Sequence, residues 1–256
     1  MKEKIAIFLS DDEFSKYSFK KLKKNFIPIP FSFKKLKFTK TNILSPYNLS
    51  EIFDFLKKAK IKKIILVGKI PATILFDKKF DFLGRQLLTS TSNWTGEEVL
   101  KKGISLLKNY GIETISLKEF FKDEIAERKI YCGNLEENEK KDIKTGISFL
   151  LDIEKYRCGQ SIVIKNGMLI CLEGIEGTDE MIKRAGRYCS DFVFVKIAGK
   201  QKDERFDLPV IGPDTVKLIA KTKGKVIAVE SGKTIIFDKE KTINYCKKFN
   251  ITLVGI

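Results

Sequence analysis

Basic and acidic side chains gather between residues 196 and 215 (KIAGKQKDERFDLPVIGPDT), which lie between an expected strand and an expected helix. Loops in such places often carry functional sites, and Lys196, Lys200, Arg205 and Asp207 all fall here. Cations next to a carboxylate suit a phosphate site, because the cations bind a diphosphate while the carboxylate holds Mg²⁺ or orients water. The alternative is a charged surface loop around a structural proline.

A second group of polar residues, EGIEGTD over residues 173–179, follows the end of an expected strand and starts an expected helix. Gly174, Gly177 and Thr178 would form a backbone cradle for an anion at the helix N-terminus. The GK[ST] ending of a P-loop is missing. A tight strand-to-helix turn with a capping box explains the same residues without a ligand.

The first half of the chain offers two weaker candidates at strand ends. Residues 10–12 (SDD) follow the first expected strand, where α/β sheets bind nucleotides, but no glycine stands there to form a dinucleotide fingerprint. Gly68 follows another strand end and is a second candidate for substrate binding. An ordinary turn is the alternative at Gly68.

Histidine is absent from all 256 residues. This absence excludes Ser-His-Asp and Cys-His catalysis in their usual forms, so hydrolysis would depend on carboxylates, lysine, backbone amides or a hard metal. The five cysteines include no CxxC pair, which fits reduced thiols. The net charge of +16 comes mostly from lysine. Arginine, the better reader of phosphates and bases, is scarce, so we expect no nucleic-acid partner.

The order of expected elements predicts an α/β fold with a Rossmann-like parallel sheet first and a mixed α/β domain second. The first half alternates strands at residues 4–9, 26–31, 63–67 and 113–116 with helices at 50–60 (N-cap Ser50) and 95–110 (N-cap Thr95). The second half has a hairpin across Asn166-Gly167, helices at 178–190, 215–222 and 239–248, and strands at 192–196, 226–229, 233–237 and 251–254. The polar stretch 124–144 predicts a domain boundary, which gives domains 1–130 and 131–256. The alternative is that this stretch is the solvated face of a helix within one domain.

Several ordered segments resemble one family, the UDP-2,3-diacylglucosamine pyrophosphatases of bacterial lipid A biosynthesis (the LpxI family). These segments are CGQ (158–160), EGIEGTDEMIKRAG (173–186), VFVKIAGK (193–200), DERFDLPVIGPDT (203–215), IAVESGKTIIFDKE (227–240) and LVGI (253–256). The first half is similar through LVGKI (66–70) and TGEEVLKKGISLLKNYGIE (95–113). The family usually has a glycine-rich turn after the first strand, where this chain has residues 9–12 (LSDD).

The resemblance implies a Rossmann-like domain, a second α/β domain, and hydrolysis of the substrate diphosphate to UMP and 2,3-diacylglucosamine 1-phosphate. It also implies a divalent cation, typically Mg²⁺, with Asp207 as the essential aspartate and Arg205 as the arginine of the same motif. We hypothesise that Asp207 ligates the metal or orients the attacking water, while Lys196 and Lys200 neutralise the diphosphate. Further candidates for metal contacts are Glu173, Glu176 and Asp179.

The diacylated substrate adds an expectation about the membrane. The N-terminus lacks a signal peptide and no apolar run is long enough to span a bilayer, so we expect a cytoplasmic protein that visits the inner-membrane surface. The phenylalanines and lysines of residues 31–40 are the candidate contact, with a surface strand over core phenylalanines as the alternative. A homodimer and a relative that binds a nucleotide-sugar or lipid without cleaving it stay open.

Overall fold

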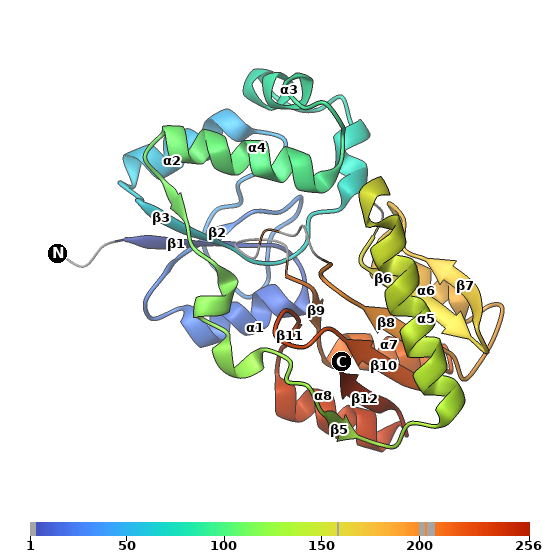
Figure 1. Ribbon diagram of the computed structural model, residues 1–256. Coiled ribbons are helices and arrows are strands. Elements are labelled where there is room, and N and C mark those ends of the chain that lie inside the picture. Colours follow the sequence, from blue (N-terminus) through green and yellow to red (C-terminus); the bar gives the residue numbers. More distant parts are fainter. Residues whose placement is uncertain (1–3, 158, 200–202, 204–207) are drawn as a thin grey trace. The chain divides into compact units, whose positions relative to one another are not determined.

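The computed structural model describes residues 4–157, 159–199, 203 and 208–256 (Figure 1). The protein has the expected α/β architecture and divides into two compact units, Met1–Phe120 and Phe121–Ile256. The boundary predicted from the sequence lies later, after residue 130. Residues 121–130 pack with the C-terminal unit, because Ala126 is buried in its core and Ile130 pairs with Val254 on the last strand.

The N-terminal unit contains a four-stranded sheet in the order β2-β1-β3-β4, in which every neighbouring pair is parallel. The strands are β1 (Ile5–Leu9), β2 (Ile27–Pro30), β3 (Lys63–Leu66) and β4 (Glu113–Thr114). The order reverses between β1 and β3, which makes the carboxyl ends of these two strands the topological switch point of the sheet.

Helices cover both faces of this sheet (Figure 1). They are α1 (Glu13–Leu22), α2 (Leu49–Lys58), α3 (Phe82–Thr89), α4 (Gly96–Asn109) and the short turns η1 (Ala72–Phe76) and η2 (Leu117–Glu119). Apolar residues of α2 and α4 pack on Ala6, Phe8 and Ile64 of the sheet. A smaller core of Leu75, Phe80 and Leu88 joins η1 to α3.

The C-terminal unit contains a six-stranded mixed sheet in the order β5-β12-β10-β8-β6-β7. Its strands are β5 (Ile130–Cys132), β6 (Ser161–Lys165), β7 (Met168–Leu172), β8 (Val193–Lys196), β10 (Val226–Val229) and β12 (Thr252–Gly255). Strands β8, β10 and β12 are parallel, while β5, β6 and β7 pair antiparallel with their neighbours. A separate parallel pair joins β9 (Val210–Ile211) to β11 (Ile235–Ile236).

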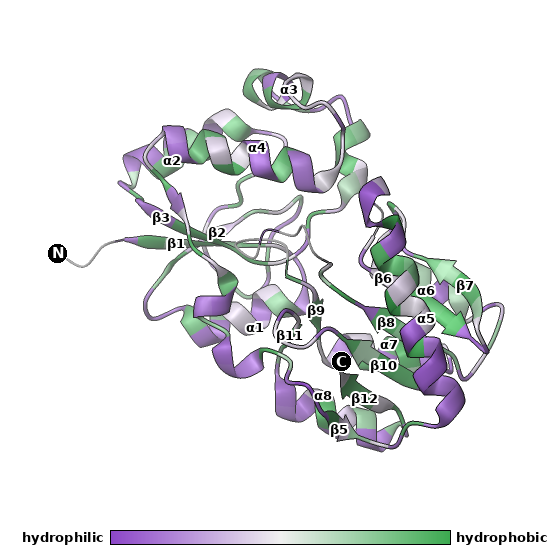
Figure 2. Ribbon diagram, viewed as in Figure 1, coloured by the Kyte–Doolittle hydropathy of each residue, from purple (hydrophilic) through white to green (hydrophobic). Residues whose placement is uncertain are grey.

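The central strands of this sheet are apolar on both faces, as Figure 2 shows, because helices cover each side. On β8, Val193 and Val195 face the core under α5, whereas Phe194 faces the core under α6, α7 and α8. The helices are α5 (Glu137–Ile153), α6 (Thr178–Ala185), α7 (Pro213–Lys221) and α8 (Lys239–Lys248), with short turns η3 (Lys122–Glu124) and η4 (Glu154–Tyr156).

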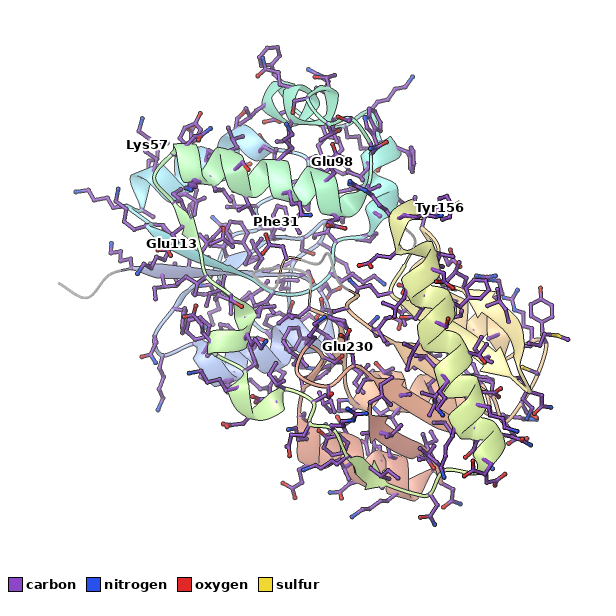
Figure 3. All side chains as sticks on the ribbon, in the orientation of Figure 1. Phe31, Lys57, Glu98, Glu113, Tyr156 and Glu230 are labelled. Atoms are coloured by element: carbon purple, nitrogen blue, oxygen red, sulfur yellow. The ribbon has the colours of Figure 1, made fainter. Side chains whose placement is uncertain are left out.

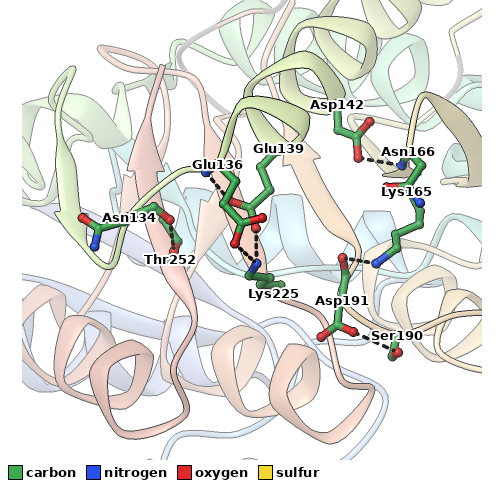
Figure 4. A network of polar contacts seen from close by, with 10 residues as sticks. All are labelled: Asn134, Glu136, Glu139, Asp142, Lys165, Asn166, Ser190, Asp191, Lys225 and Thr252. Atoms are coloured by element: carbon green, nitrogen blue, oxygen red, sulfur yellow. Dashed lines mark hydrogen bonds and ion pairs between the residues drawn. The ribbon is translucent and has the colours of Figure 1, made fainter.

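Polar contacts close the amino edge of this sheet (Figure 4). The buried carboxylate of Asp142 on α5 accepts hydrogen bonds from the backbone N–H groups of Asn166 (2.8 Å) and Gly167 (2.6 Å). Lys225 pairs with Glu136 at 2.7 Å and Glu139 at 2.8 Å, and these hydrogen bonds raise the pKa of the lysine. These contacts tie the β6–β7 turn and the start of β10 to α5.

The strands and helices named from the sequence are present, apart from shifts of their ends. The hairpin turn has positive φ at Asn166 (51°) and Gly167 (78°), as the expected type I′ turn requires. The predicted cap Thr95 is confirmed for α4, but the cap of α2 was wrong, since Asn48 and not Ser50 caps this helix. Gly177 occupies the cap position of α6. Elements not anticipated are α1, α3, β5 and β9, whereas α5 is the helix given as the alternative for the polar stretch 124–144.

Candidate functional site

The candidate site of the C-terminal unit begins at the carboxyl end of β8. Lys196 is the last residue of this strand and lies opposite Ser161, the first residue of β6. Only 7% of Lys196 is exposed, and its ammonium group donates hydrogen bonds to the hydroxyls of Thr178 (2.8 Å) and Ser161 (3.2 Å). A buried ammonium with hydroxyl partners is a cation held in a fixed position, which suits the binding of an anion at this edge.

Glu173 continues this hydrogen-bond chain. Its Oε1 accepts the hydroxyl of Thr178 at 2.8 Å, and its Oε2 accepts the backbone N–H of Gln160 at 3.0 Å. Its backbone N–H donates to the carbonyl of Ser161 at 3.0 Å. The backbone of Gly159 passes so close that an added Cβ would lie 2.3 Å from Glu173 Cγ. The carboxylate is therefore enclosed by the chain entering β6.

Thr178 connects the two charged residues because it is the first residue of α6. Gly177 precedes it with φ of +81°, and its N–H donates to the carbonyl of Gly174 at 3.2 Å, which closes the turn between β7 and the helix. The backbone N–H groups of the first helical turn and the buried lysine lie at the same edge of the sheet. The residues predicted to bind an anion at 173–179 therefore contact Lys196, the predicted lysine, through Thr178.

The other two acids of this segment lie elsewhere. Glu176 forms an ion pair with Arg184 at 2.5 Å, and Asp179 is exposed in the first turn of α6. Within residues 4–157, 159–199, 203 and 208–256, no three His, Cys, Asp or Glu side chains come together as a metal site. Glu173, Glu176 and Asp179 therefore do not form a shared ligand set, and their assignment as metal ligands stays a prediction.

The predicted loop starts next to this cluster. Glu230 follows β10 (Figure 3), and its Oε2 accepts the backbone N–H groups of Ala198 (2.7 Å) and Gly199 (3.2 Å). Lys233 pairs with Glu230 at 2.9 Å and donates to the carbonyl of Gly199 at 2.8 Å. The backbone just beyond Lys196 is thus held by one carboxylate and one lysine.

Three predicted residues, Lys200, Arg205 and Asp207, lie outside the described residues. The chain is described again from Leu208, and Pro213 begins α7 as its first residue, two residues before the predicted start of this helix at Thr215. Asp214 in its first turn pairs with Lys217 at 2.9 Å.

No individual role was predicted for Ser161, Gln160 or Glu230. Ser161 is adjacent to Lys196 only through the antiparallel register of β6 and β8, which no local pattern encodes. Glu230 could have been predicted from the sequence, because an acidic residue directly after an apolar strand of a parallel sheet lies at the carboxyl edge, where binding sites form.

The N-terminal unit has its own polar cluster at the switch point between β1 and β3. Asp12 caps α1 through the backbone N–H of Ser15 (2.7 Å) and also accepts the backbone N–H of Lys69 (2.8 Å). Ser10 donates to the same carboxylate at 2.5 Å. An added Cβ on Gly68 would lie 2.1 Å from Ser10 Oγ, so the backbone here must be glycine. A carboxylate occupies the helix N-terminus where a bound phosphate would otherwise sit.

The aromatic residues of 31–40 do not share one exposed face. Phe31 packs edge-on against Phe8 with ring centroids 5.5 Å apart, and Phe38 lies 5.6 Å from Phe19. Only Phe33 is well exposed, at 45%. The rings of Phe31 and Phe38 are half-buried by their neighbours, and the membrane contact of residues 31–40 stays a prediction.

Comparison with protein families matches both units in order. The LpxI N-terminal domain matches residues 30–124, and the LpxI C-terminal domain matches residues 128–254. The chain belongs to the LpxI family. This membership supports a role in lipid A biosynthesis, and the cluster of Lys196, Thr178 and Glu173 lies within the C-terminal match. No match to the chain was found among curated proteins.

Proposed function

We propose that this protein hydrolyses the diphosphate of UDP-2,3-diacylglucosamine to UMP and 2,3-diacylglucosamine 1-phosphate. The observation that carries the proposal is the buried ammonium of Lys196 at the start of helix α6, within a chain that matches both LpxI domains. A diphosphate diester carries two negative charges. A fixed cation and helix N–H groups at one edge are the groups that bind such charge.

Lys196 would stabilise the charge that accumulates on the diphosphate as the phosphorus–oxygen bond breaks. The hydroxyls of Ser161 and Thr178 fix the position of its ammonium group, and Glu173 in turn fixes Thr178. Because the lysine is already desolvated, little solvent has to reorganise around it during the reaction. Glu173 is a positioning residue in this scheme, since both of its oxygens accept hydrogen bonds from the protein.

Asp207 is our candidate for the residue that orients the attacking water, on the basis of the DLPVIGP segment. With no histidine in the chain, a carboxylate is the natural group to accept a proton from water. Mg²⁺ dependence is a separate expectation. The acids of the described residues do not gather into a ligand set, and Asp207, the predicted metal ligand, lies outside those residues.

The test measures UMP release from UDP-2,3-diacylglucosamine by the protein and by Asp207→Asn. The substitution is nearly isosteric and removes the negative charge, so we expect turnover to fall by at least about 10²-fold. Asp214→Asn is the matched control, because Asp214 lies nearby in sequence but is an exposed partner of Lys217. Near-normal turnover by folded Asp207→Asn would exclude the assigned role, and no UMP release by the unaltered protein would exclude the reaction.

The second candidate function is binding of the nucleotide-sugar without cleavage. It is favoured by one observation: the Asp12 carboxylate fills the turn after β1, where the family usually has glycines. Thermal shift with UDP, followed by the UMP assay, separates the two functions. Stabilisation by UDP without turnover would support the binding function.

A further inference from the structure

Exposed aromatic side chains form a strip on the N-terminal unit. Its exposed members are Phe33, Phe76, Phe82 and Trp94, and the half-buried Tyr47 links them; these five residues are here called the aromatic strip. Phe76 and Phe82 are 65% and 68% exposed, and Trp94 and Phe33 are 48% and 45% exposed. Large apolar side chains exposed to this degree and grouped together mark contact surfaces more often than single exposed residues do.

Two ring contacts and two hydrogen bonds through neighbouring residues link the strip, although its members are far apart in sequence. The rings of Phe33 and Tyr47 lie 5.0 Å apart, and those of Phe76 and Trp94 lie 6.5 Å apart. The hydroxyl of Tyr47 donates to Asp77, the neighbour of Phe76. Phe82 is joined through the residue before it, whose backbone N–H donates to the carbonyl of Tyr47 at 2.9 Å.

Basic side chains surround the strip. Residues 31–40 and 76–85 contain seven lysines and arginines, all exposed, against two aspartates. Both aspartates are engaged, since Asp77 accepts the Tyr47 hydroxyl and Asp81 caps α3 through the N–H of Gly84 at 2.8 Å. Among the described residues, Lys78 and Arg85 have no acidic partner, and Lys79 lies 5.7 Å from the Tyr47 ring. Lys34 pairs with Asp11 at 2.7 Å, whereas the charges of Lys78, Lys79 and Arg85 are available to an external anion.

We propose that the aromatic strip and its lysines bind the surface of an anionic lipid bilayer. Phenylalanine and tryptophan side chains insert at the headgroup boundary, and lysines around them pair with lipid phosphates. A second copy of the chain is a poorer occupant, because a two-fold contact would oppose two faces of the same positive charge. None of the described helices is long and apolar enough to cross a bilayer. The proposal extends the proposed function by bringing the protein to the membrane that holds a diacylated substrate, but the binding does not require turnover.

Trp94 provides a direct test because it is the chain's single tryptophan. The unaltered protein is mixed with vesicles of phosphatidylcholine and phosphatidylglycerol in equal parts, and with vesicles of phosphatidylcholine alone. We expect a blue shift of Trp94 emission and quenching by brominated acyl chains with the anionic vesicles, weakening at high salt. Unchanged emission and no quenching with anionic vesicles would overturn the proposal. Quenching by single-stranded DNA without any response to vesicles would overturn it in favour of base stacking.

Variants then test each component of the surface by vesicle sedimentation. Lys78→Glu with Lys79→Glu should weaken binding by at least about tenfold, given about 1 kcal/mol for each lysine near an anionic surface. The matched charge control is Lys141→Glu with Lys144→Glu, on exposed positions of α5.

Phe76→Ala should weaken vesicle binding by roughly tenfold, because a buried aromatic ring contributes a few kcal/mol at most. Tyr188→Ala is its control, since Tyr188 is 71% exposed but lies on the C-terminal unit. Equal binding by the strip variants and their controls would overturn the assignment of the surface. UMP release from detergent-dispersed substrate is measured in parallel: loss of vesicle binding with retained release separates this proposal from the proposed function.

Discussion

Replacement of Lys196 by methionine is the sharpest test of the candidate site. Methionine has nearly the same length and removes the charge together with the hydrogen bonds to Thr178 and Ser161. If the ammonium stabilises the diphosphate in the transition state, kcat/KM should fall by roughly 10²–10³-fold, the loss seen when one preorganised donor is removed.

The same change should have a small effect on stability. Hydrogen bonds to a charged group contribute about 1.5–3 kcal/mol each, but desolvation of a lysine that is 7% exposed costs several kcal/mol. The two terms oppose each other, so the free energy of unfolding should change by no more than about 2 kcal/mol. Glu173 keeps the Thr178 hydroxyl and the Gln160 amide as donors, so no buried carboxylate loses all its partners.

UMP release and urea denaturation of Lys196→Met are therefore measured together. Lys165→Met is the matched control, because Lys165 is at the opposite end of β6 and donates to the carbonyl of Asp191 at 3.0 Å (Figure 4). Normal kcat/KM in Lys196→Met would refute the reasoning. A loss of stability above about 4 kcal/mol would also refute it, because the lysine would then be a structural group whose removal leaves a buried partner unpaired.

Three further predictions concern backbone strain, thiol acidity and the metal. Gly68→Ala should lower the free energy of unfolding by more than about 2 kcal/mol, since the added Cβ would lie 2.1 Å from Ser10 Oγ. Gly111 also has positive φ but has nothing within 4 Å of an added Cβ, so Gly111→Ala should cost only about 1 kcal/mol. Both are measured by urea denaturation, and equal losses would show that the close contact at Gly68 is unimportant. The hydrogen bond from Cys246 lowers the pKa of Cys132 to about 7, so iodoacetamide labelling of Cys132, mapped by mass spectrometry, should rise with pH and be half-maximal near 7. Cys246→Ala removes the donor and should move this midpoint upward, and a midpoint unchanged by that substitution would contradict the assignment. Chelation with EDTA should abolish UMP release and added Mg²⁺ should restore it, whereas full activity in EDTA would remove the expected metal requirement.

The local sequence determined most of the secondary structure and two parts of the site. Alternating apolar runs specified the strands, and Asn166-Gly167 specified the hairpin turn, because both depend only on residues a few positions apart. The absence of histidine and the position of Lys196 at a strand end also follow from the sequence alone. The long helix α5 was predicted only as the alternative to a domain boundary, because its first half is highly charged and its apolar face is recognisable only against the sheet it covers.

Only the tertiary structure decided which polar groups meet. Glu173 and Glu176 are equivalent candidates in the sequence, yet one binds Thr178 at the lysine while the other pairs with Arg184. The register of β6 against β8 brings Ser161 to Lys196, and chain folding brings Phe33, Tyr47, Phe76 and Trp94 into one strip. Such contacts join residues that are distant along the chain, and they depend on strand order and packing, which no short pattern encodes.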